Sequence, residues 1–343
     1  MEDELFVSPG CDFAGVFDGH GGAKVSNYLR RNVYSRFLQE LQPGSGNKDW
    51  SIGSIKRALR CALKRCDDEV GLLKHWDQQG STVSIVFIRR WLGASASGAT
   101  EGIGDHDDYD DDGDDVDDDD DDDNNNNKED DYELDKGKDA VVCMNLGDSR
   151  AVLARDGIAL ELSKDHKPDR PDERDRIEKL GGVVQWHGLL KNSKPLIGAG
   201  CYRMNGNLAL SRSAGDRYER PFLSAVPDLT STVLKETDEF VCLATDGLWD
   251  VFDSQELVSF VLSCKNAALS DSRADLLPFG GLVDRREVFR AVSLFNKRAA
   301  AQGALTGASR LGLFHRIVPS LVIDAASRRG SSDNISCVIV WFK

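Results

Sequence analysis

Hydrophobic positions along the chain follow two periods, which predict a mixture of strands and helices. Near-continuous apolar runs of strand length, typical of strands buried on both faces, occupy residues 13–17, 84–91, 140–147, 239–247 and 334–342. Apolar residues three to four positions apart predict helices around residues 25–41, 52–73, 257–261 and 288–295. Runs of strands with helices grouped in pairs favour a layered α+β domain over alternating βαβ units.

Two hairpins are predicted in the middle of the chain. The runs 84–91 and 140–147 flank a long polar stretch, which reads as a hairpin loop enlarged by low-complexity sequence. The GDSR turn at 147–150, followed by the apolar run 151–157, predicts a second hairpin.

The polar stretch between the first two runs, residues 94–138, is predicted to be a disordered acidic insert, because it has almost no apolar residues to bury. Residues 105–123 contain fifteen aspartates, a charge equal in size to the whole formal net charge of −15. The remainder of the chain is therefore close to neutral. We interpret the insert as a solvated spacer; loose calcium binding, contact with a basic partner, and a chaperone-like role toward basic proteins are the alternatives.

Composition narrows the class of protein. With 343 residues, 40% of them hydrophobic, the chain can bury a sizeable core. No apolar stretch approaches the roughly 20 residues that span a bilayer, and the acidic start MEDELFVSPG does not have the order of a signal peptide. Eight cysteines without CxxC pairs indicate neither a zinc site nor a disulfide framework. We expect a cytoplasmic or nuclear protein that is monomeric and has no nucleic-acid partner.

Acidic residues recur where the predicted strands end. In FAGVFDGHGG, residues 13–22, a buried run stops at a carboxylate, a histidine and glycines, and other acids stand in comparable places: Glu2, Asp3, Asp148, Asp246, Asp250 and Asp333. Carboxylates that converge at one rim of a sheet repel one another and take up protons. A divalent cation relieves that repulsion, and oxygen ligands without cysteine favour Mg²⁺ or Mn²⁺.

The sequence resembles the metal-dependent protein phosphatases of type 2C, the PPM family of serine/threonine phosphatases. Eight segments stand in the family's order: MED (1–3), VFDGHGG (16–22), GST (80–82), NLGDSRAVL (145–153), DHKPDRPDERDRIEKLGG (165–182), NGNLALSRSAGD (205–216), ATDGLWD (244–250) and GSSDNISCVIV (330–340). The resemblance implies one PPM-type domain over 1–343, with the acidic insert 94–138 and an elaborated segment 265–328. It also implies an α+β fold: a central sandwich of two antiparallel β-sheets, flanked on both faces by pairs of antiparallel helices.

The resemblance also implies a binuclear Mg²⁺ or Mn²⁺ centre. Asp18 corresponds to the carboxylate that bridges the two ions, and the carbonyl of Gly19 is a ligand. Glu2 holds one ion, mostly through water. Asp246 and Asp333 hold the other.

A weaker third ion is implied at Asp148, with Asp246 and Asp250. His20 is expected to be the general acid that protonates the departing seryl or threonyl oxygen of a phosphoprotein substrate; the alternative is that it orients water or a carboxylate. Asp18 and His20 are thus the predicted catalytic pair.

Other conspicuous residues are expected to be structural. His166 in the DHKP motif is interpreted as an architectural residue, and Arg150 and Arg212 as ion-pair partners.

The start of the chain departs from the family pattern. The family has an opening strand and a phosphate-binding arginine before MED, whereas this sequence begins at Met1. We therefore expect it to be a piece of a longer protein. The competing hypothesis is a pseudophosphatase, which binds phosphoproteins with weak or no turnover.

Overall fold

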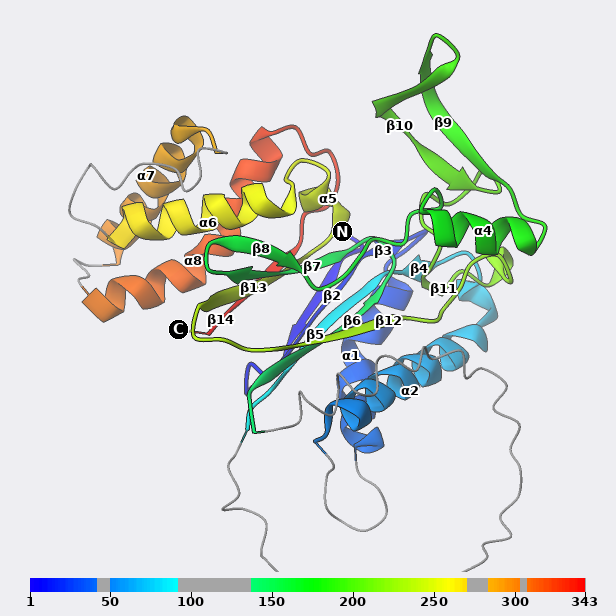
Figure 1. Ribbon diagram of the computed structural model, residues 1–343, viewed down its shortest axis with the longest axis horizontal. Coiled ribbons are helices and arrows are strands. Elements are labelled where there is room, and N and C mark those ends of the chain that lie inside the picture. The colour runs from blue at the N-terminus through cyan, green and yellow to red at the C-terminus, as the bar shows by residue number, and fades with distance from the viewer. Residues whose placement is uncertain (42–49, 92–136, 270–282, 303–306, 343) are drawn as a thin grey trace, which may run out of the picture.

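The computed structural model describes residues 1–41, 50–91, 137–269, 283–302 and 307–342. In these residues the chain forms two large antiparallel sheets with helices on both outer sides (Figure 1). The predicted acidic insert, 94–138, lies outside the described residues except for its last two positions.

The first sheet has five strands, in the order β1 (Glu4–Val7), β2 (Phe13–Phe17), β5 (Val83–Arg89), β6 (Ala140–Leu146) and β12 (Asp228–Val233). Strands β5 and β6 pair antiparallel from Val83 opposite Leu146 to Arg89 opposite Ala140. The predicted hairpin around the acidic stretch is therefore confirmed.

The second sheet has four strands, in the order β14 (Cys337–Trp341), β13 (Asp238–Ala244), β7 (Arg150–Arg155) and β8 (Ile158–Glu161). Apolar side chains from both sheets form one buried cluster, among them Val16, Val86, Val141, Leu153 and Leu243. The two inner faces thus bury each other, as in a β-sandwich, and the predicted fold class is confirmed.

The second predicted hairpin, across the GDSR turn, is wrong. Strand β6 belongs to the first sheet, whereas β7 pairs with β13 in the second. The chain turns at Gly147, where φ is 100° and a Cβ would lie 2.7 Å from the Thr82 side chain. Only glycine takes this turn without strain. Asp148 consequently lies where the chain crosses from one sheet to the other.

Two helices, α1 (Lys24–Glu40) and α2 (Ile52–Gly71), cover the first sheet. Helix α1 buries Val25, Leu29, Val33 and Phe37, which are the positions that the helical spacing predicts. Helix α2 begins at its N-cap Ser51, whose side chain accepts a hydrogen bond from the backbone N–H of Ser54. Apolar side chains of α1, α2 and the first sheet together form a second buried layer.

Three helices, α6 (Ser254–Leu269), α7 (Arg285–Ala301) and α8 (Gly307–Arg328), cover the second sheet. The described part of the segment 265–328 thus adds a third helix to the expected pair (Figure 1). The helical spacing around Val288, Val292 and Phe295 is confirmed, because all three are buried in α7. Phe295 packs edge-to-face on Phe314 of α8, with 5.6 Å between ring centroids.

Smaller elements lie at one end of the sandwich. They are β3 (Gly19–His20), β4 (Gly80–Ser81), β11 (Ala214–Gly215), α4 (Pro171–Lys179), α5 (Asp246–Trp249) and the 3₁₀ turns η1 (Lys74–Trp76) and η2 (Arg217–Glu219). A hairpin of β9 (Val184–Lys191) and β10 (Lys194–Met204) projects from the body beside α4 (Figure 1). No helix in the described part of the chain is long and apolar enough to cross a bilayer. All eight cysteines are free thiols, and Cys143, Cys242 and Cys337, which lie in apolar runs, are buried.

Candidate active site

Asp18 stands between β2 and β3, and Thr82 forms hydrogen bonds with both the N–H and the carbonyl of its backbone. Its N–H donates to Oγ1 of Thr82 at 3.2 Å, and its carbonyl accepts the N–H of Thr82 at 2.9 Å. Burial raises the pKa of the Asp18 carboxyl to about 10, with further contributions from the charges of Asp246, Asp3 and Asp148. This carboxyl is therefore fixed in a place where a negative charge is costly.

Asp246 is the first residue of α5, and Thr245 alone separates it from the end of β13. Burial and the neighbouring Asp148 raise the pKa of its carboxyl to about 7. Asp250 follows one turn later, and its N–H donates to the carbonyl of Asp246 at 2.8 Å. Burial raises the pKa of Asp250 as well, while the cation of Lys167 opposes that change. The TDGLWD motif thus places two carboxyl groups, both with a destabilised ionised form, one helical turn apart at the end of β13.

Asp148, on the crossing between the sheets, is 4% exposed and forms an ion pair with the ammonium of Lys167. Burial lowers the pKa of Lys167, but the charge of Asp148 and its hydrogen bond outweigh burial and raise it. The charges of Asp246 and Asp165 add to this effect. Lys167, which sequence reasoning did not single out, therefore lies against the carboxylates as a cation.

Asp3 also belongs to this group of buried carboxylates. From the sequence it was recognised only as an acid beside Glu2, not as a site residue. It is 7% exposed, and its Oδ2 accepts a hydrogen bond from the hydroxyl of Thr245 at 3.2 Å. Burial raises its pKa, and the charge of Asp333 acts in the same direction. The signal that could have found it is its place in MED, directly after a proposed ligand.

The backbones of Glu2 and Gly19 lie close together. The carbonyl of Glu2 accepts a hydrogen bond from the hydroxyl of Ser26 at 2.6 Å, and its N–H donates to Oδ1 of Asn334 at 3.3 Å. A Cβ on Gly19 would lie 2.6 Å from that Glu2 carbonyl, so glycine is required for this close approach. Asp333, next to Asn334, is exposed.

These acids, taken as a set, suit a hard divalent cation. Their donors are all oxygens, and burial combined with like charge raises the pKa of Asp3, Asp18, Asp246 and Asp250. A divalent cation would stabilise that arrangement, and oxygen donors suit Mg²⁺ and Mn²⁺. Across the described residues, no group of three or more His, Cys, Asp or Glu side chains is arranged so that it could hold a metal ion. The assignment of individual ligands therefore stays a prediction.

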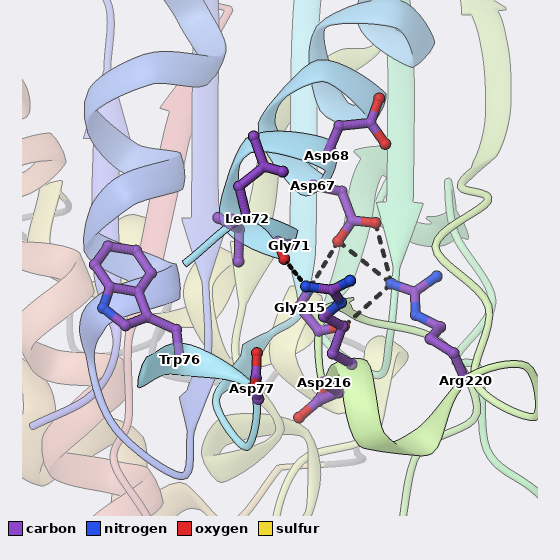
Figure 2. A pocket seen from close by; sticks show the side chains of 11 residues that line it. Asp67, Asp68, Gly71, Leu72, Trp76, Asp77, Gly215, Asp216 and Arg220 are labelled. Carbon is purple, nitrogen blue, oxygen red and sulfur yellow. Dashed lines mark hydrogen bonds and ion pairs between the residues drawn. The ribbon is translucent and has the colours of Figure 1, made fainter. Parts of the chain in front are cut away.

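His20 lies at the end of β3 and is paired with Asp216, which sequence reasoning missed. Its Nε2 is 2.6 Å from Oδ2 of Asp216. Burial lowers the pKa of His20, but the hydrogen bond to Asp216 and its charge outweigh burial and raise the pKa. Asp216 also borders a pocket of about 290 Å³, in which Asp67 and Arg220 form an ion pair (Figure 2). Its place at the end of the SAGD motif is the signal that could have drawn attention to it.

The residues expected to be structural contact other parts of the fold, and Arg150 and Arg212 form the ion pairs expected of them. His166 is fully buried, and its Nδ1 accepts a hydrogen bond from the N–H of Gly147 at 3.0 Å. Arg150 pairs with Asp165 at 2.7 Å, and Arg212 pairs with Glu173 at 2.6 Å.

Comparison with known proteins agrees with this architecture. The family model described as Protein phosphatase 2C matches residues 118–275. The curated relatives include Probable protein phosphatase 2C 8 of Oryza sativa subsp. japonica, 30% identical, with 96% of this chain and 62% of the relative covered. Probable protein phosphatase 2C 69 of Arabidopsis thaliana is 33% identical, with 96% of this chain and 60% of the relative covered.

Solved structures share the fold. A serine-threonine phosphatase 2C from Toxoplasma gondii has a TM-score of 0.56 at 19% identity, with 100% of this chain and 90% of that chain covered. A sex determining protein of C. elegans has a TM-score of 0.62 at 21% identity, with 100% and 61% covered.

A sandwich of two antiparallel sheets between helical layers, with carboxylates gathered where strands end, defines the class of PPM-type phosphatase folds. The chain is similar to the protein phosphatase 2C family in its match to the family model and in its curated relatives. It spans about three fifths of the length of the two curated relatives just described.

Proposed function

We propose that the chain is a metal-dependent protein serine/threonine phosphatase that hydrolyses phosphoserine and phosphothreonine in proteins through a binuclear Mg²⁺ or Mn²⁺ centre. The observation that carries this proposal is the crowding of Asp18, Asp246 and Asp148 beside His20. Burial and mutual repulsion destabilise the ionised carboxylates there. Groups of this kind, with strongly shifted pKa values, concentrate at functional sites.

The proposed ligands are divided between the two ions as the family resemblance implies. The residues that would hold the ions are Asp18, Glu2, Asp246 and Asp333, together with the carbonyl of Gly19. When bound, the two ions would lower the pKa of water for attack on phosphorus and would neutralise phosphate charge. The two hydrogen bonds between Thr82 and the Asp18 backbone hold the central aspartate in place without a metal.

A third, weaker ion is proposed at Asp148, Asp246 and Asp250. Asp148 is already neutralised by Lys167, whose positive charge also lowers the pKa of Asp246 and Asp250. A third cation would have to compete with that ammonium. Weak binding at this position follows from the competition.

His20 is the proposed general acid. Once water attacks phosphorus, the P–O bond to the seryl or threonyl side chain breaks and its electron pair stays on that oxygen. A proton from the imidazolium of His20 then converts the poor alkoxide leaving group into a hydroxyl. The raised pKa of His20 favours the protonated ring that this step needs.

The proposal is tested by hydrolysis of a phosphothreonine peptide by the 343-residue chain in Mn²⁺ or Mg²⁺ and in EDTA. We expect phosphate release that requires the metal and is lost in Asp18→Asn. Activity that persists in EDTA would overturn the metal mechanism. Binding of the phosphopeptide without turnover would instead favour the pseudophosphatase.

A further inference from the structure

Three short strands from distant parts of the sequence meet beside the proposed site. They form a separate sheet in the order β11–β4–β3. Gly80 of the central strand β4 lies opposite His20 of β3 on one side and opposite Gly215 of β11 on the other. The DGHGG, GST and SAGD motifs, which lie about 60 and 135 positions apart, are thus joined by hydrogen bonds between backbones.

Gly80 allows two side chains to meet across the central strand. A Cβ at this position would lie 1.9 Å from Oδ2 of Asp216 and 2.5 Å from Nε2 of His20. Both distances are too short for any side chain. The contact between His20 and Asp216, 2.6 Å between Nε2 and Oδ2, therefore occupies the space that the missing side chain leaves.

Asp216 is held firmly in this contact. It is 4% exposed, and its backbone adopts φ of 48°, a left-handed conformation that is uncommon for residues other than glycine. Its N–H donates to the carbonyl of Gln79 at 3.0 Å, and the hydroxyl of Ser213 donates to its Oδ2. A strained backbone that surrounding contacts maintain is a common feature of functional sites.

Strand β11, which ends at the residue before Asp216, is also fixed by helix α2. Asp67 accepts the N–H of Gly215 at 2.7 Å and pairs with Arg220, and Arg220 donates to the carbonyl of Gly215 at 3.1 Å (Figure 2). Asp216 thus sits on a rigid support rather than on a loose loop.

We propose that Asp216 is the positioning residue of His20: it accepts the hydrogen bond of Nε2–H, fixes the plane of the ring, and leaves Nδ1 as the nitrogen that protonates the departing oxygen. The inference rests on the proposed phosphatase function, in which His20 is the general acid. When the P–O bond breaks, its electron pair goes to the seryl or threonyl oxygen, which takes the proton from Nδ1. The neutral ring that remains keeps its Nε2–H on Asp216. Which nitrogen of a histidine carries out proton transfer is commonly set by the partner of the other nitrogen.

The test compares two substrates that differ in how much they need an acid. Hydrolysis of a phosphothreonine peptide releases a threonyl alkoxide, which requires protonation. Hydrolysis of p-nitrophenyl phosphate releases nitrophenolate, which requires little protonation. We expect Asp216→Ala to lower kcat for the peptide by about 10²-fold, the lower end of the usual contribution of general acid catalysis. For p-nitrophenyl phosphate we expect a loss of a few-fold only, with KM for the peptide little changed.

Three further variants separate a positioning role of Asp216 from a general loss of structure. Asp216→Asn preserves size, but its amide can turn an NH₂ toward Nε2 and stabilise the wrong tautomer, so the same selective loss is expected, as in the serine-protease triad. In a His20→Ala background, Asp216→Ala should cost nothing more, because residues that act as a unit are not additive. Asp68→Ala, an exposed carboxylate that lines the same pocket, is the matched control and should leave both substrates unaffected.

Equal losses on both substrates, full activity in Asp216→Asn, or an added loss in the His20→Ala background would each overturn the positioning role. A wild-type chain that does not release phosphate from the peptide with Mn²⁺ would instead overturn the proposed function itself. The two failures are therefore distinguishable.

Discussion

The protein buries carboxylates in two regions, and the two regions treat them in opposite ways. At α4, Glu173 is 1% exposed, and its two oxygens accept hydrogen bonds from Arg212 at 2.6 Å and Arg176 at 2.8 Å. Burial alone would raise the pKa of Glu173, but these arginines lower it. At the strand ends, Asp18 and Asp246 face other carboxylates, and their pKa values rise.

The difference shows which feature separates a structural acid from a functional one. Burial disfavours the charged form in both regions, so burial does not distinguish them. The distinction is the partner: guanidinium groups neutralise the acids beside α4, whereas the acids beside Asp18 leave net negative charge for a ligand to neutralise.

The largest expected effect comes from neutralising the central carboxyl. Asp18→Asn should lower kcat for a phosphothreonine peptide by several orders of magnitude, because it removes the proposed bridging ligand. The same substitution should raise the melting temperature of the metal-free protein, because folding no longer requires a proton on a carboxyl that is ionised in the unfolded state at neutral pH. Steady-state kinetics and calorimetric melting in EDTA measure the two effects. A variant that loses activity and also melts below the wild type would contradict the comparison.

Neutralising the buried carboxylate beside α4 should have the opposite effects, a loss of stability with little change in kcat. Glu173→Gln leaves Arg212 without its buried partner, and breaking such a pair typically costs about 3 kcal/mol or more of unfolding free energy. We expect kcat per folded molecule to stay close to that of the wild type. Urea unfolding followed by activity assays at low temperature tests both points. A loss of kcat comparable to that of Asp18→Asn would place Glu173 in the active site and remove the contrast.

Metal binding should increase the free energy of unfolding of the folded protein. A ligand that binds only the folded state adds about 2.7 kcal/mol when its concentration is 100 times its dissociation constant. Saturating Mn²⁺ or Mg²⁺ should therefore raise the melting temperature of the wild type and of Glu173→Gln, but not that of an Asp18→Asn/Asp246→Asn double variant. An equal rise in all three proteins would assign the stabilisation to sites elsewhere.

The stability of the metal-free protein should also depend on pH. Folding raises the pKa of Asp18 from 3.8 to about 10, so the folded state retains a proton that the unfolded state releases. Metal-free stability should therefore fall as pH rises from about 4 toward 10. Folding lowers the pKa of Asp228 from 3.8 to about 2, so its contribution is present above pH 4 and is lost as pH falls through 2. Melting temperatures across pH in EDTA should show both limbs, and Asp18→Asn should flatten the alkaline one.

Much of the fold could be predicted from local patterns. Runs such as 140–147 and 239–247 give buried strands, and the spacing of Val25, Leu29 and Val33 gives a helix, because burial imposes the period of each element. The crossing at Gly147 could not be predicted in this way. A turn signal shows that the chain changes direction but not which sheet receives the next strand.

The site shows the same limit. Strand-end acids were recognisable because an acid beside a glycine after an apolar run is unusual, which led to Asp18, Asp246 and Asp148. Asp216 was missed because its role depends on contact with His20, 196 positions away in the sequence. Nothing in local sequence reveals that Gly80 leaves room for that contact. Pairings of this kind follow from sheet register rather than from a motif.

The most direct test of the account is calorimetric titration of Mn²⁺ into the metal-free 343-residue chain, with Asp18→Asn and Glu173→Gln titrated alongside. The account predicts that the wild type and Glu173→Gln bind Mn²⁺ with the same affinity, and that Asp18→Asn binds it at least tenfold more weakly. This follows because, of the two buried regions compared, the region beside Asp18 is the one whose carboxylates lack cationic neighbours sufficient to balance them. Wild-type affinity in Asp18→Asn, or no binding by the wild type, would contradict the claim that the crowded carboxylates form a metal site.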